Sequence, residues 1–240
     1  VDAVVIRSCW DYHLREREFS RWIGQLEQTG TTVINPPELV RWNRHKNYIG
    51  RLADQGIPVV PTVWIRRGDA RSLRDVLGAA GWKETVVKPA ISASAYETWR
   101  VADGEAEAHE ERFARLRAEG DVLVQQYLPE VTRDGEWSLM FFGLEYSHAV
   151  RKLPKSGDFR VQTEHGGSVA SDVAPPRLID DARLVLQALP VTPVYCRVDG
   201  VIVDDMFMLM EVECIDPVLF FTLHQQAAGR FADEVMRRIG

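Results

Sequence analysis

The pattern of hydrophobic and polar positions changes its period along the chain, which predicts a mixed α/β protein. Short apolar runs bounded by turn residues are typical of strands, whereas apolar residues spaced by three and four are typical of helices. The first run ends at Arg7, and the segment 16–29 then places Phe19, Ile23 and Leu26 on one helical face. Strand and helix patterns continue to the end of the chain, without an internal repeat or a low-complexity segment.

The predicted elements can be placed by residue range. Strands are predicted at 3–8, 32–35, 59–65, 85–89, 98–101, 122–126, 136–142 and 145–152, followed by two late strands that carry Asp199 and Glu211. Helices are predicted at 16–29, 70–80, 105–118, 177–188 and 224–238. A further helix is predicted to be capped by Asn43 and to carry Lys46 in its first turn. The stretch from 153 to about 170 is predicted to be a long loop, which is uncommon unless it acts as a lid.

Glu211 and Glu213 are the sharpest chemical signal in the chain. They lie two residues apart in the apolar run MLMEVEC, so on a strand both point to one face of a mostly buried sheet. Two neighbouring anions in a core need a cation. One interpretation is a pair of ion-paired core acids with Arg197 on the neighbouring strand. The other is a metal site.

Asp199 favours the metal site. It lies in the strand pattern VYCRVDGVIV, and only Asp204-Asp205 interrupts the chain before the next strand. Antiparallel pairing would bring three carboxylates together. Hard oxygen donors of this kind, together with substrate phosphates, suit Mg²⁺.

The strand register decides whether the three acids share a face. A plain two-residue turn would pair Val203 with Met206 and turn Asp199 to the wrong face. We therefore predict a three- or five-residue connection, or else a bulge that restores the parity. Phe207 and Leu209 are then expected on the face of the acids.

Two lysines suggest a bound anion. Lys46 at a helix N-terminus would oppose the macrodipole unless both share an anion. Lys88 ends the apolar strand in VVKPA, where a charge is costly without a partner, although an exposed lysine at a strand end is the ordinary alternative. The following run ISASAYE, with Ser92 and Ser94, would let a phosphate approach the backbone. Neither GxxxxGK[ST] nor GxGxxG occurs, which argues against the P-loop and dinucleotide folds.

Six stretches between residues 34 and 217 carry a family resemblance when taken in order. They are INPPELVRWNRHKNYIGRLADQGIPVVPT, VVKPAISASA, VLVQQYLPEV, GEWSLMFFGLEYSHAVRKLPKSGDFRVQTEHGGS, CRVDGVIV and MLMEVECIDP. Together they resemble the ATP-grasp superfamily in its glutathione-synthetase-like branch. Within that branch the chain is most similar to ligases of the cycloserine-biosynthesis type.

The resemblance implies an α/β (α+β) ATP-grasp fold, in which two α+β subdomains clasp ATP behind an open α/β N-terminal domain. We expect a partial N-terminal substrate domain at 1–43, the small ATP-grasp subdomain at 44–126, and the large subdomain with the metal and substrate site at 127–240. Val1 stands directly before a strand, so an upstream strand–helix unit is expected to lie outside this sequence.

The resemblance also implies the ATP site. Lys46 and Lys88 would grip the phosphates, and Glu136, or Glu130 as the alternative, would hold the ribose. The loop after Lys88 would cover the phosphates with Ser92 and Ser94. The adenine would be read by the backbone of a hinge formed by Gln125, Gln126, Tyr127 and Leu128.

Asp199, Glu211 and Glu213 would bind two Mg²⁺ ions that bridge the phosphates. The chain departs from many relatives at Glu213, where an asparagine is common. It also departs in the loop after Lys88, which lacks the usual glycines.

Enzymes of this family phosphorylate a carboxylate with ATP, and an amine then attacks the acylphosphate. The barrier is largely repulsion between two anions, so cations are needed along the line of transfer. Arg151, Lys152, Arg160 and Arg197 are suitable by type, and the resemblance directs Arg151 and Arg160 to the acylphosphate. The residues predicted to be catalytic are Arg151, Arg160 and Arg197. Gly166 and Gly167 would let backbone N–H groups approach the reacting carboxyl group.

The residues after the first strand form a second constellation. Arg7, Trp10, Asp11 and His13 follow five apolar or small residues, and ligands collect beyond the carboxyl ends of strands in open α/β sheets. We expect the distal part of the substrate there. His13 is more simply explained as a hydrogen-bonded loop histidine than as a catalytic base.

Composition limits the partners. The net charge of −6 and the lack of a basic run argue against nucleic acid and anionic membrane surfaces. No apolar stretch approaches the length of a membrane span. Three cysteines without metal spacing predict reduced thiols and a cytoplasmic protein. An assembly of identical copies is compatible with this composition.

The sequence therefore predicts an ATP-dependent carboxylate–amine ligase that uses ATP and Mg²⁺. Its expected substrates are a small-molecule carboxylate and an amine of amino-acid type. The resemblance points to the cyclisation of an O-ureidoserine-type compound in antibiotic biosynthesis. The alternatives are a non-catalytic ATP-binding regulatory module and a small-molecule kinase.

Overall fold

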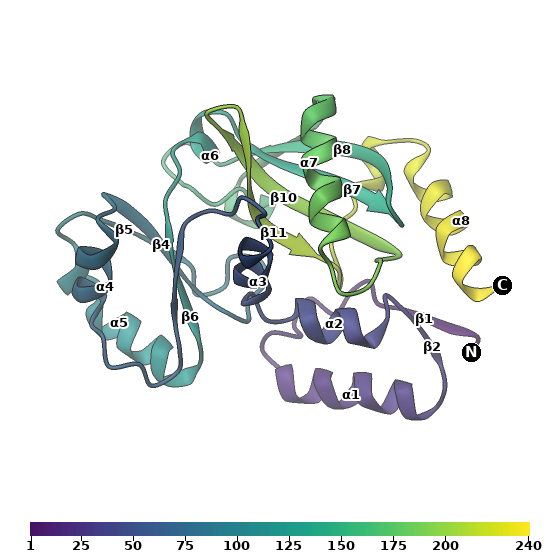
Figure 1. Ribbon diagram of the computed structural model, residues 1–240, viewed down its shortest axis with the longest axis horizontal. Helices are drawn as coiled ribbons and strands as arrows, with labels where there is room; N and C mark the ends of the chain where they lie inside the picture. Colours follow the sequence, from purple (N-terminus) through teal and green to yellow (C-terminus); the bar gives the residue numbers. More distant parts are fainter. The chain divides into compact units, whose positions relative to one another are not determined.

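The computed structural model describes residues 1–240, and the chain folds into two compact units. Unit 1 comprises Val1–Val59 and Glu130–Gly240, and unit 2 comprises Val60–Pro129. Each unit combines a sheet with helices, as the sequence pattern predicts (Figure 1). The functional division at 1–43, 44–126 and 127–240 stays a prediction.

Unit 2 is built on an antiparallel sheet in the order β3-β6-β4-β5. Its strands are β3 (Thr62–Ile65), β4 (Glu84–Pro89), β5 (Trp99–Ala102) and β6 (Val122–Gln126), and its helices are α4 (Leu73–Ala80) and α5 (Ala106–Glu119). Val87, Val124 and Phe113 belong to one buried core with residues of both helices. Helix α4 is capped by Ser72, whose hydroxyl accepts from the N–H of Asp75 in a capping box.

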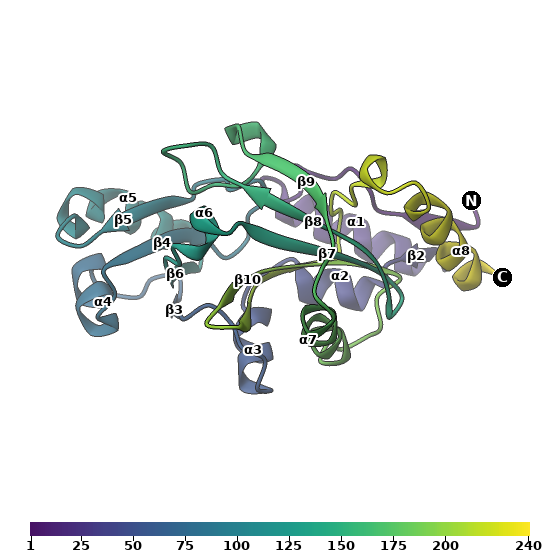
Figure 2. The ribbon, with the colours of Figure 1, turned by 90° about the horizontal axis from the view of Figure 1, so that it is seen from above.

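Unit 1 contains two sheets. The strands of the larger, antiparallel sheet, in spatial order, are β11 (Met206–Glu213), β10 (Tyr195–Val203), β7 (Glu136–Phe142), β8 (Glu145–Leu153) and β9 (Ser168–Asp172). The smaller sheet pairs β1 (Ala3–Val5) with β2 (Thr32–Ile34) in parallel. The helices are α1 (Glu16–Gln28), α2 (Pro37–Asn43), α3 (Tyr48–Asp54), α6 (Glu130–Arg133), α7 (Pro176–Gln187) and α8 (Ala227–Ile239). Helix α7 lies along one face of the larger sheet (Figure 2).

One face of the larger sheet is apolar at one end of its strands and polar at the other. Because side chains alternate across a strand, Phe142, Met140, Ser138 and Glu136 of β7 share this face. Phe142 and Met140 belong to a core with Tyr195 and residues of α8, whereas Ser138 and Glu136 lie at the polar end. The apolar end anchors the sheet, and the polar end carries the candidate site.

The segment around Lys46 differs from the prediction. Helix α2 ends at Asn43 and α3 begins at Tyr48, so Lys46 lies in the turn between two short helices. The predicted Asn43 cap is wrong, because Pro36-Pro37 starts an earlier helix and Asn43 is buried at its end.

The predicted loop after 153 is also shorter than expected. A 3₁₀ turn forms at Thr163–His165, and β9 pairs with β8 as the fifth strand. None of the helices is long and apolar enough to cross a membrane.

Candidate active site

The connection between β10 and β11 is a two-residue turn at Asp204-Asp205, and both residues have positive φ angles of 48° and 61°. Val203 therefore pairs with Met206, and the predicted longer connection is wrong. The alternative is confirmed, because the register shifts after Asp199, which stands opposite Glu211. The bulge restores the parity and brings the three acids to one face.

The same bulge reverses the residues beyond it. Phe207 and Leu209 were expected on the face of the acids, and that expectation is wrong. A Cβ built on Gly200 would lie 2.3 Å from the Phe207 ring, so Phe207 packs across Gly200 on the opposite face. The bulge lies between the acids and these residues. The alternation of side chains between the two faces is therefore shifted by one residue across it.

Arg197 and Asp199 form the buried centre of the site. Arg197 Nε donates to Asp199 Oδ1 at 2.9 Å, and Nη2 donates to Oδ2 at 2.9 Å. Arg197 also contacts the Glu213 carboxylate, and the Ser138 hydroxyl donates to Asp199 Oδ1. Burial acts to raise the pKa of Asp199, but Arg197 and Lys152 outweigh it and hold that pKa below its usual value. Of the two glutamates predicted to pair with Arg197, only Glu213 does so, whereas Glu211 pairs with Lys46.

Lys152 and Glu136 extend the centre toward β8. Lys152 Nζ lies 2.5 Å from Glu136 Oε1 and 3.7 Å from Asp199 Oδ2, and all three side chains are buried. Burial raises the pKa of Glu136 and opposes the charge of Lys152, but Asp199 and Glu136 keep the Lys152 pKa above its usual value. Both residues of the Lys152–Glu136 pair are thus tied to the Arg197–Asp199 pair.

Lys46 completes the site from the turn between α2 and α3. Its Nζ lies 2.7 Å from Glu211 Oε1, and only 5% of the residue is exposed. Asn43 donates to the O of Val212 at 2.7 Å, and the Tyr48 hydroxyl donates to the same oxygen at 2.9 Å. These bonds on both sides of Lys46 fix the turn to β11, which explains how a loop lysine reaches a strand carboxylate.

These seven residues form what we call the charged cluster. It consists of Lys46, Glu136, Lys152, Arg197, Asp199, Glu211 and Glu213. Four carboxylates face three cations, which leaves an excess of negative charge. Burial and the neighbouring carboxylates, against the opposing effect of Arg197, raise the pKa of Glu213 to about 7. An added cation would relieve this excess.

In unit 2, Lys88 belongs to a chain of hydrogen bonds. Its Nζ donates to Gln125 Oε1 at 3.0 Å, and Gln125 Nε2 donates to the Thr62 hydroxyl at 3.0 Å. The N–H groups of Gln126 and Tyr127 are bonded to the O of Pro61 and of Glu84. Leu128 is buried, and the Arg100 guanidinium lies 4.9 Å from the centre of the Tyr127 ring.

The loop after Lys88 takes glycine-like conformations without glycine. Ser94 and Ala95 have φ angles of 48° and 54°, in the left-handed region that costs an L-residue about 1–2 kcal/mol. Ser92 is buried, and its hydroxyl donates to the O of Pro89. The missing glycines thus leave the loop strained.

The structure does not bring Arg151 to the charged cluster. Arg151 pairs with Trp137 on the opposite face of the sheet, lies over the Trp137 ring at 4.5 Å, and forms an ion pair with Asp172 at 2.5 Å. Because side chains alternate, only one of two neighbours can face Asp199, and that residue is Lys152.

Arg160, Gly166 and Gly167 lie in the connection between β8 and β9. Arg160 pairs with Asp158 at 2.7 Å and is partly buried. Gly166 has a φ of 84°, and a Cβ on Gly167 would lie 2.2 Å from the O of Val161. Both glycines are therefore required by the fold of this connection.

The residues after β1 are spread over a partly exposed loop. Trp10 is 62% exposed, Asp11 is exposed beside Arg15, and burial lowers the pKa of His13. Arg7 is partly buried and donates to the O of Pro217 at 2.9 Å. This contact holds the Arg7 guanidinium against the segment after β11.

Comparison with known proteins gives the family. Residues 1–35 match the family model described as the N-terminal domain of D-cycloserine synthetase DcsG. The chain is 34% identical over 250 residues to the cycloserine biosynthesis protein DcsG of Streptomyces lavendulae, covering 99% of this chain and 83% of that protein. It belongs to the ATP-grasp ligases. The crystal structure of DcsG superimposes with a TM-score of 0.90 at 32% identity, covering 100% of this chain and 84% of that one.

Two further ATP-grasp relatives are more distant. A glutathione synthetase of Ralstonia nicotianae is 26% identical over 249 residues, covering 100% of this chain and 72% of that protein. A D-alanine–D-alanine ligase of Bacillus anthracis, crystallised with ATP, has a TM-score of 0.70 at 18% identity, covering 90% of this chain and 72% of that one. The second likeness supports the ATP-grasp fold alone. The predicted family and fold class are thus confirmed.

The carboxylates of the cluster suit Mg²⁺ by type, although no three of them are arranged so that they could hold a metal ion by themselves. Glu211 and Glu213 present hard carboxylate oxygens from one strand, and about a third of each side chain is exposed. Asp199 is buried and already accepts from Arg197 and Ser138. Within the cluster, the two glutamates are thus accessible, whereas Asp199 is buried and held in place.

Proposed function

We propose that this ATP-grasp chain is an ATP-dependent carboxylate–amine ligase that works through an acylphosphate and releases ADP and phosphate. The observation that carries this proposal is the charged cluster, in which buried cations and carboxylates share one face of a sheet. Such an arrangement suits the transfer of a charged phosphoryl group, whose barrier is dominated by charge and positioning.

Glu211 and Glu213, with Asp199, would hold two Mg²⁺ ions on the nucleotide. Bound Mg²⁺ would neutralise phosphate charge during transfer. Lys46 Nζ contacts Glu211 in the structure. With a nucleotide bound at Glu211, Lys46 would instead contact a phosphate oxygen. The raised Glu213 pKa supports this assignment, since a cation would favour the ionised form.

Arg197 and Lys152 would supply the fixed positive charge beside the reacting carboxylate. Both are buried and held by acids, so neither needs to reorganise during the reaction. We assign to Lys152 the role that the resemblance gives to Arg151, because only Lys152 faces Asp199. Glu136 would hold the ribose, with Lys152 orienting its carboxylate.

Unit 2 would supply the second grip on the nucleotide. Lys88, held by Gln125, would bind phosphate, and the loop with Ser92 and Ser94 would cover it. The N–H groups of Gln126 and Tyr127 already donate to carbonyl groups of the protein. The other backbone N–H and C=O groups between Gln125 and Leu128 would therefore bind the adenine.

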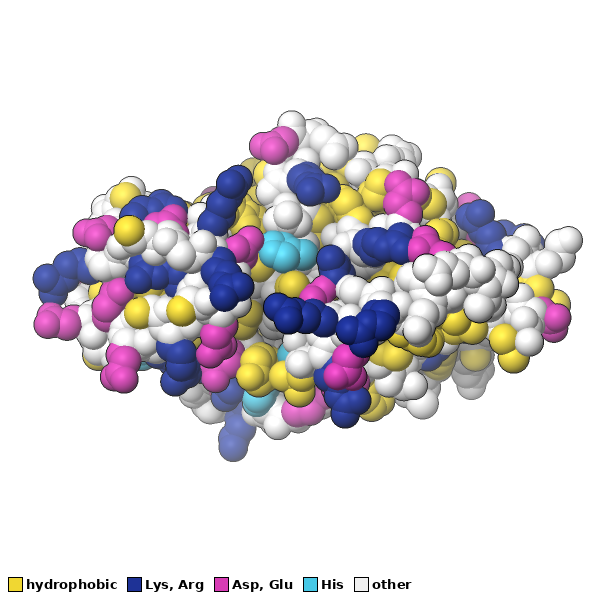
Figure 3. All heavy atoms as spheres, turned by 90° about the horizontal axis from the view of Figure 1, so that it is seen from below, with side chains coloured by type: hydrophobic (Ala, Val, Ile, Leu, Met, Phe, Trp, Pro, Cys, Tyr) yellow, Lys and Arg dark blue, Asp and Glu magenta, His cyan; other side chains and the backbone are white.

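The substrate would be a small amino-acid-like carboxylate, and an O-ureidoserine-type compound is the specific candidate by similarity to DcsG. Arg160, Gly166 and Gly167 would approach it from the β8–β9 connection, and Arg7, Trp10, Asp11 and His13 from the loop after β1. Acidic and basic side chains are interspersed on the face shown in Figure 3, which supports a small-molecule partner over nucleic acid. The three free cysteines support a cytoplasmic location.

The test is ADP release with a panel of amino acids, dipeptides and both enantiomers of O-ureidoserine. A ligase should release ADP with one acid and form a product without phosphate. Adding hydroxylamine should divert an acylphosphate to a hydroxamate. ADP release without a hydroxamate would support the small-molecule kinase, and ATP binding without ADP release would support the regulatory module.

A further inference from the structure

The loop between β4 and β5 ends near an acid that the proposed ATP site does not use. This loop, residues 90–98, follows Lys88 and lies within unit 2. Lys88, Ser92 and Ser94 are proposed to act at the phosphates, whereas the Glu97 carboxylate contacts helix α5. Glu97 is partly buried. The loop therefore has an attachment to α5 in addition to its two strands.

The attachment is an ion pair between Glu97 and one arginine of α5. Arg112 Nε and Nη2 donate to Glu97 Oε2 at 3.1 and 2.8 Å. Arg115 Nη2 lies 3.8 Å from the same oxygen. Residues three apart on a helix lie on one face, so two cations of α5 converge on one carboxylate. Hydrogen bonds between ionised groups are roughly twice as strong as neutral ones.

Arg112 is itself held against the core of unit 2. Its guanidinium carbon lies 4.0 Å from the centre of the Trp99 ring, within the range of a cation–π contact. Trp99 is buried at the start of β5 and belongs to the same core as Val87 of β4 and Phe113 of α5. The contacts from Glu97 to Arg112 and from Arg112 to Trp99 thus tie the end of the loop to the core.

The backbone of the loop explains why an attachment is needed. Three of its residues have positive φ angles, which L-residues rarely adopt, namely Ser94 at 48°, Ala95 at 54° and Glu97 at 48°. Two internal hydrogen bonds run from the N–H of Tyr96 to the O of Ala93 and from the N–H of Thr98 to the O of Ala95. Unfavourable backbone angles persist only where surrounding contacts enforce them. The ion pair of Glu97 is such a contact.

We propose that Glu97 is a positioning residue for ATP, whose ion pair with Arg112 holds the loop, before the nucleotide binds, in the shape that covers the phosphates. This inference rests on the proposed function, in which Lys88, Ser92 and Ser94 bind those phosphates. A loop that is shaped in advance loses less conformational freedom on binding than a flexible one. The nucleotide therefore binds more tightly, although Glu97 does not touch it.

The effect on the phosphates can be tested by calorimetry without an acid substrate. The two ligands, each with Mg²⁺, are AMP-PNP, a non-hydrolysable analogue of ATP, and AMP, which lacks the β- and γ-phosphates. Glu97→Gln should weaken binding of AMP-PNP by about tenfold and change binding of AMP by less than about twofold. A general loss of structure would weaken both. Glu107→Gln removes an ion pair of similar length between α5 and α4, and it should leave both affinities unchanged.

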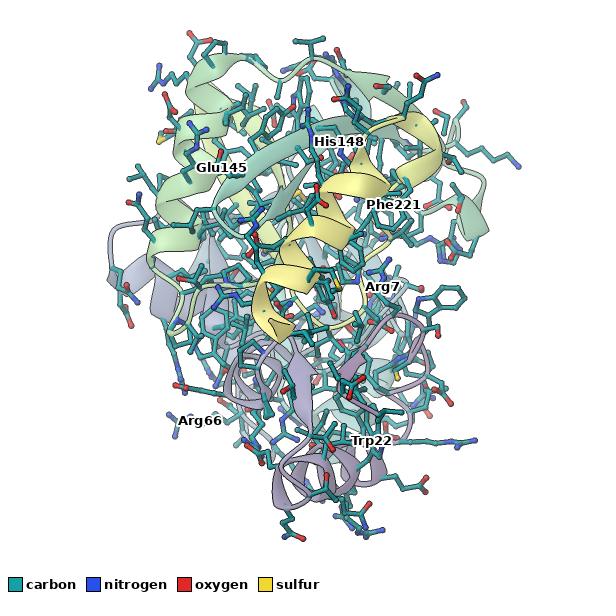
Figure 4. All side chains as sticks on the ribbon, turned by 90° about the vertical axis from the view of Figure 1, so that its right-hand side faces the viewer. Arg7, Trp22, Arg66, Glu145, His148 and Phe221 are labelled. Atoms are coloured by element: carbon teal, nitrogen blue, oxygen red, sulfur yellow. The ribbon has the colours of Figure 1, made fainter.

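A second test shows whether Glu97 acts through Arg112. Arg112→Gln should weaken AMP-PNP binding as much as Glu97→Gln, and the double variant should be no weaker than either, because all three lack the same pair. Arg66→Gln controls for the loss of a positive charge, since Arg66 is an exposed residue of unit 2 that extends from the surface (Figure 4). It should keep the affinity of the wild type. Thermal unfolding would establish that the variants fold.

Hydrogen exchange tests the shape of the loop directly and includes the wild type. Without nucleotide, the amides of Tyr96 and Thr98 should already be protected, because both donate within the loop. In Glu97→Gln they should exchange at least about tenfold faster, and AMP-PNP should restore part of the protection.

The outcomes separate the positioning role from the proposed ligase. Equal AMP-PNP binding by the wild type and Glu97→Gln, or an equal loss for AMP and AMP-PNP, would overturn the role of Glu97 and leave ATP binding in place. Additive losses in the double variant would also overturn it. If the variants do not fold, free exchange of the wild-type amides until nucleotide is added would overturn it by itself. A wild type that binds no nucleotide would contradict the proposed ATP site and, with it, the role of Glu97.

Discussion

The charged cluster of unit 1 and the hydrogen-bonded chain Lys88–Gln125–Thr62 of unit 2 hold their cations in different ways. In unit 1, Arg197 and Lys152 are neutralised by carboxylates within ion-pair distance. In unit 2, Lys88 is held by the neutral amide of Gln125, which in turn donates to Thr62. The amide of Gln125 carries no net charge, so this contact does not neutralise Lys88. A paired cation instead shares its charge with a neighbour, and removing either member leaves an uncompensated ion.

The largest expected effect is on the accessible acids of the cluster. Glu211→Gln should lower turnover by roughly a thousandfold or more, because phosphoryl transfer depends on metal neutralisation. The measurement is kcat at ordinary Mg²⁺, with thermal unfolding to show that the fold is intact. Glu145→Gln, an exposed glutamate at the start of β8, is the matched control. Near-normal turnover in Glu211→Gln would refute its role as a metal ligand.

Removing the buried cation of β8 should act on stability. Lys152→Met leaves Glu136 and Asp199 without one partner and should cost about 3–5 kcal/mol in the free energy of unfolding. Adding Glu136→Gln should recover part of that loss. Urea unfolding of both variants would measure it. A small loss in the single variant, without recovery in the double variant, would show that the pair is not a coupled buried unit.

Lys88 and Arg160 should separate nucleotide affinity from substrate affinity. Lys88→Ala should raise the KM for ATP and lower kcat, whereas Arg160→Ala should raise only the KM for the carboxylate substrate, each by about tenfold to a hundredfold. Steady-state kinetics with each substrate varied in turn would show this. Equal effects of the two variants on ATP would contradict the division of roles.

Glu213 should give a smaller, pH-dependent effect. Because burial raises its pKa to about 7, the folded protein binds a proton that the unfolded chain releases at lower pH. Its contribution to stability is therefore lost as pH rises toward 7. Glu213→Gln should gain on the wild type by about 1 kcal/mol between pH 5 and 8, after allowance for partial exposure. Urea unfolding at both pH values tests the sign, and a relative loss would contradict it.

The smallest expected effect is in the loop after Lys88. Ala95→Gly should raise the free energy of unfolding by up to about 1 kcal/mol, because glycine accepts the positive φ without strain. Ala93→Gly, where φ is not positive, is the matched control and should give no gain. If both variants lower stability equally, the loop is not strained at Ala95.

Much of the site could be predicted because it rests on short periodicities. The spacing of Glu211 and Glu213 fixes their common face on any strand, and Lys88 follows an apolar run that must be a strand. The mixed α/β class follows from the alternation of patterns with two different periods. These inferences need only local geometry.

Other features escaped prediction because they depend on distant contacts. The predicted helix around Lys46 differs from the observed turn, because the side chains of Asn43 and Tyr48 hydrogen-bond to Val212 of β11. Strand β9 lies within the predicted loop, and its residues pair with β8.

The sequence by itself determined the fold class, the family resemblance and the acids that share a strand face, because these follow from residue order and alternation. The tertiary structure alone decided that a bulge after Asp199 aligns the three acids, that Lys152 rather than Arg151 faces them, and that Lys46 reaches Glu211. Each of these outcomes depends on which face of the sheet a side chain occupies or on how two strands are paired. A single inserted residue reverses such a choice, and only the packing of neighbouring strands and helices determines it.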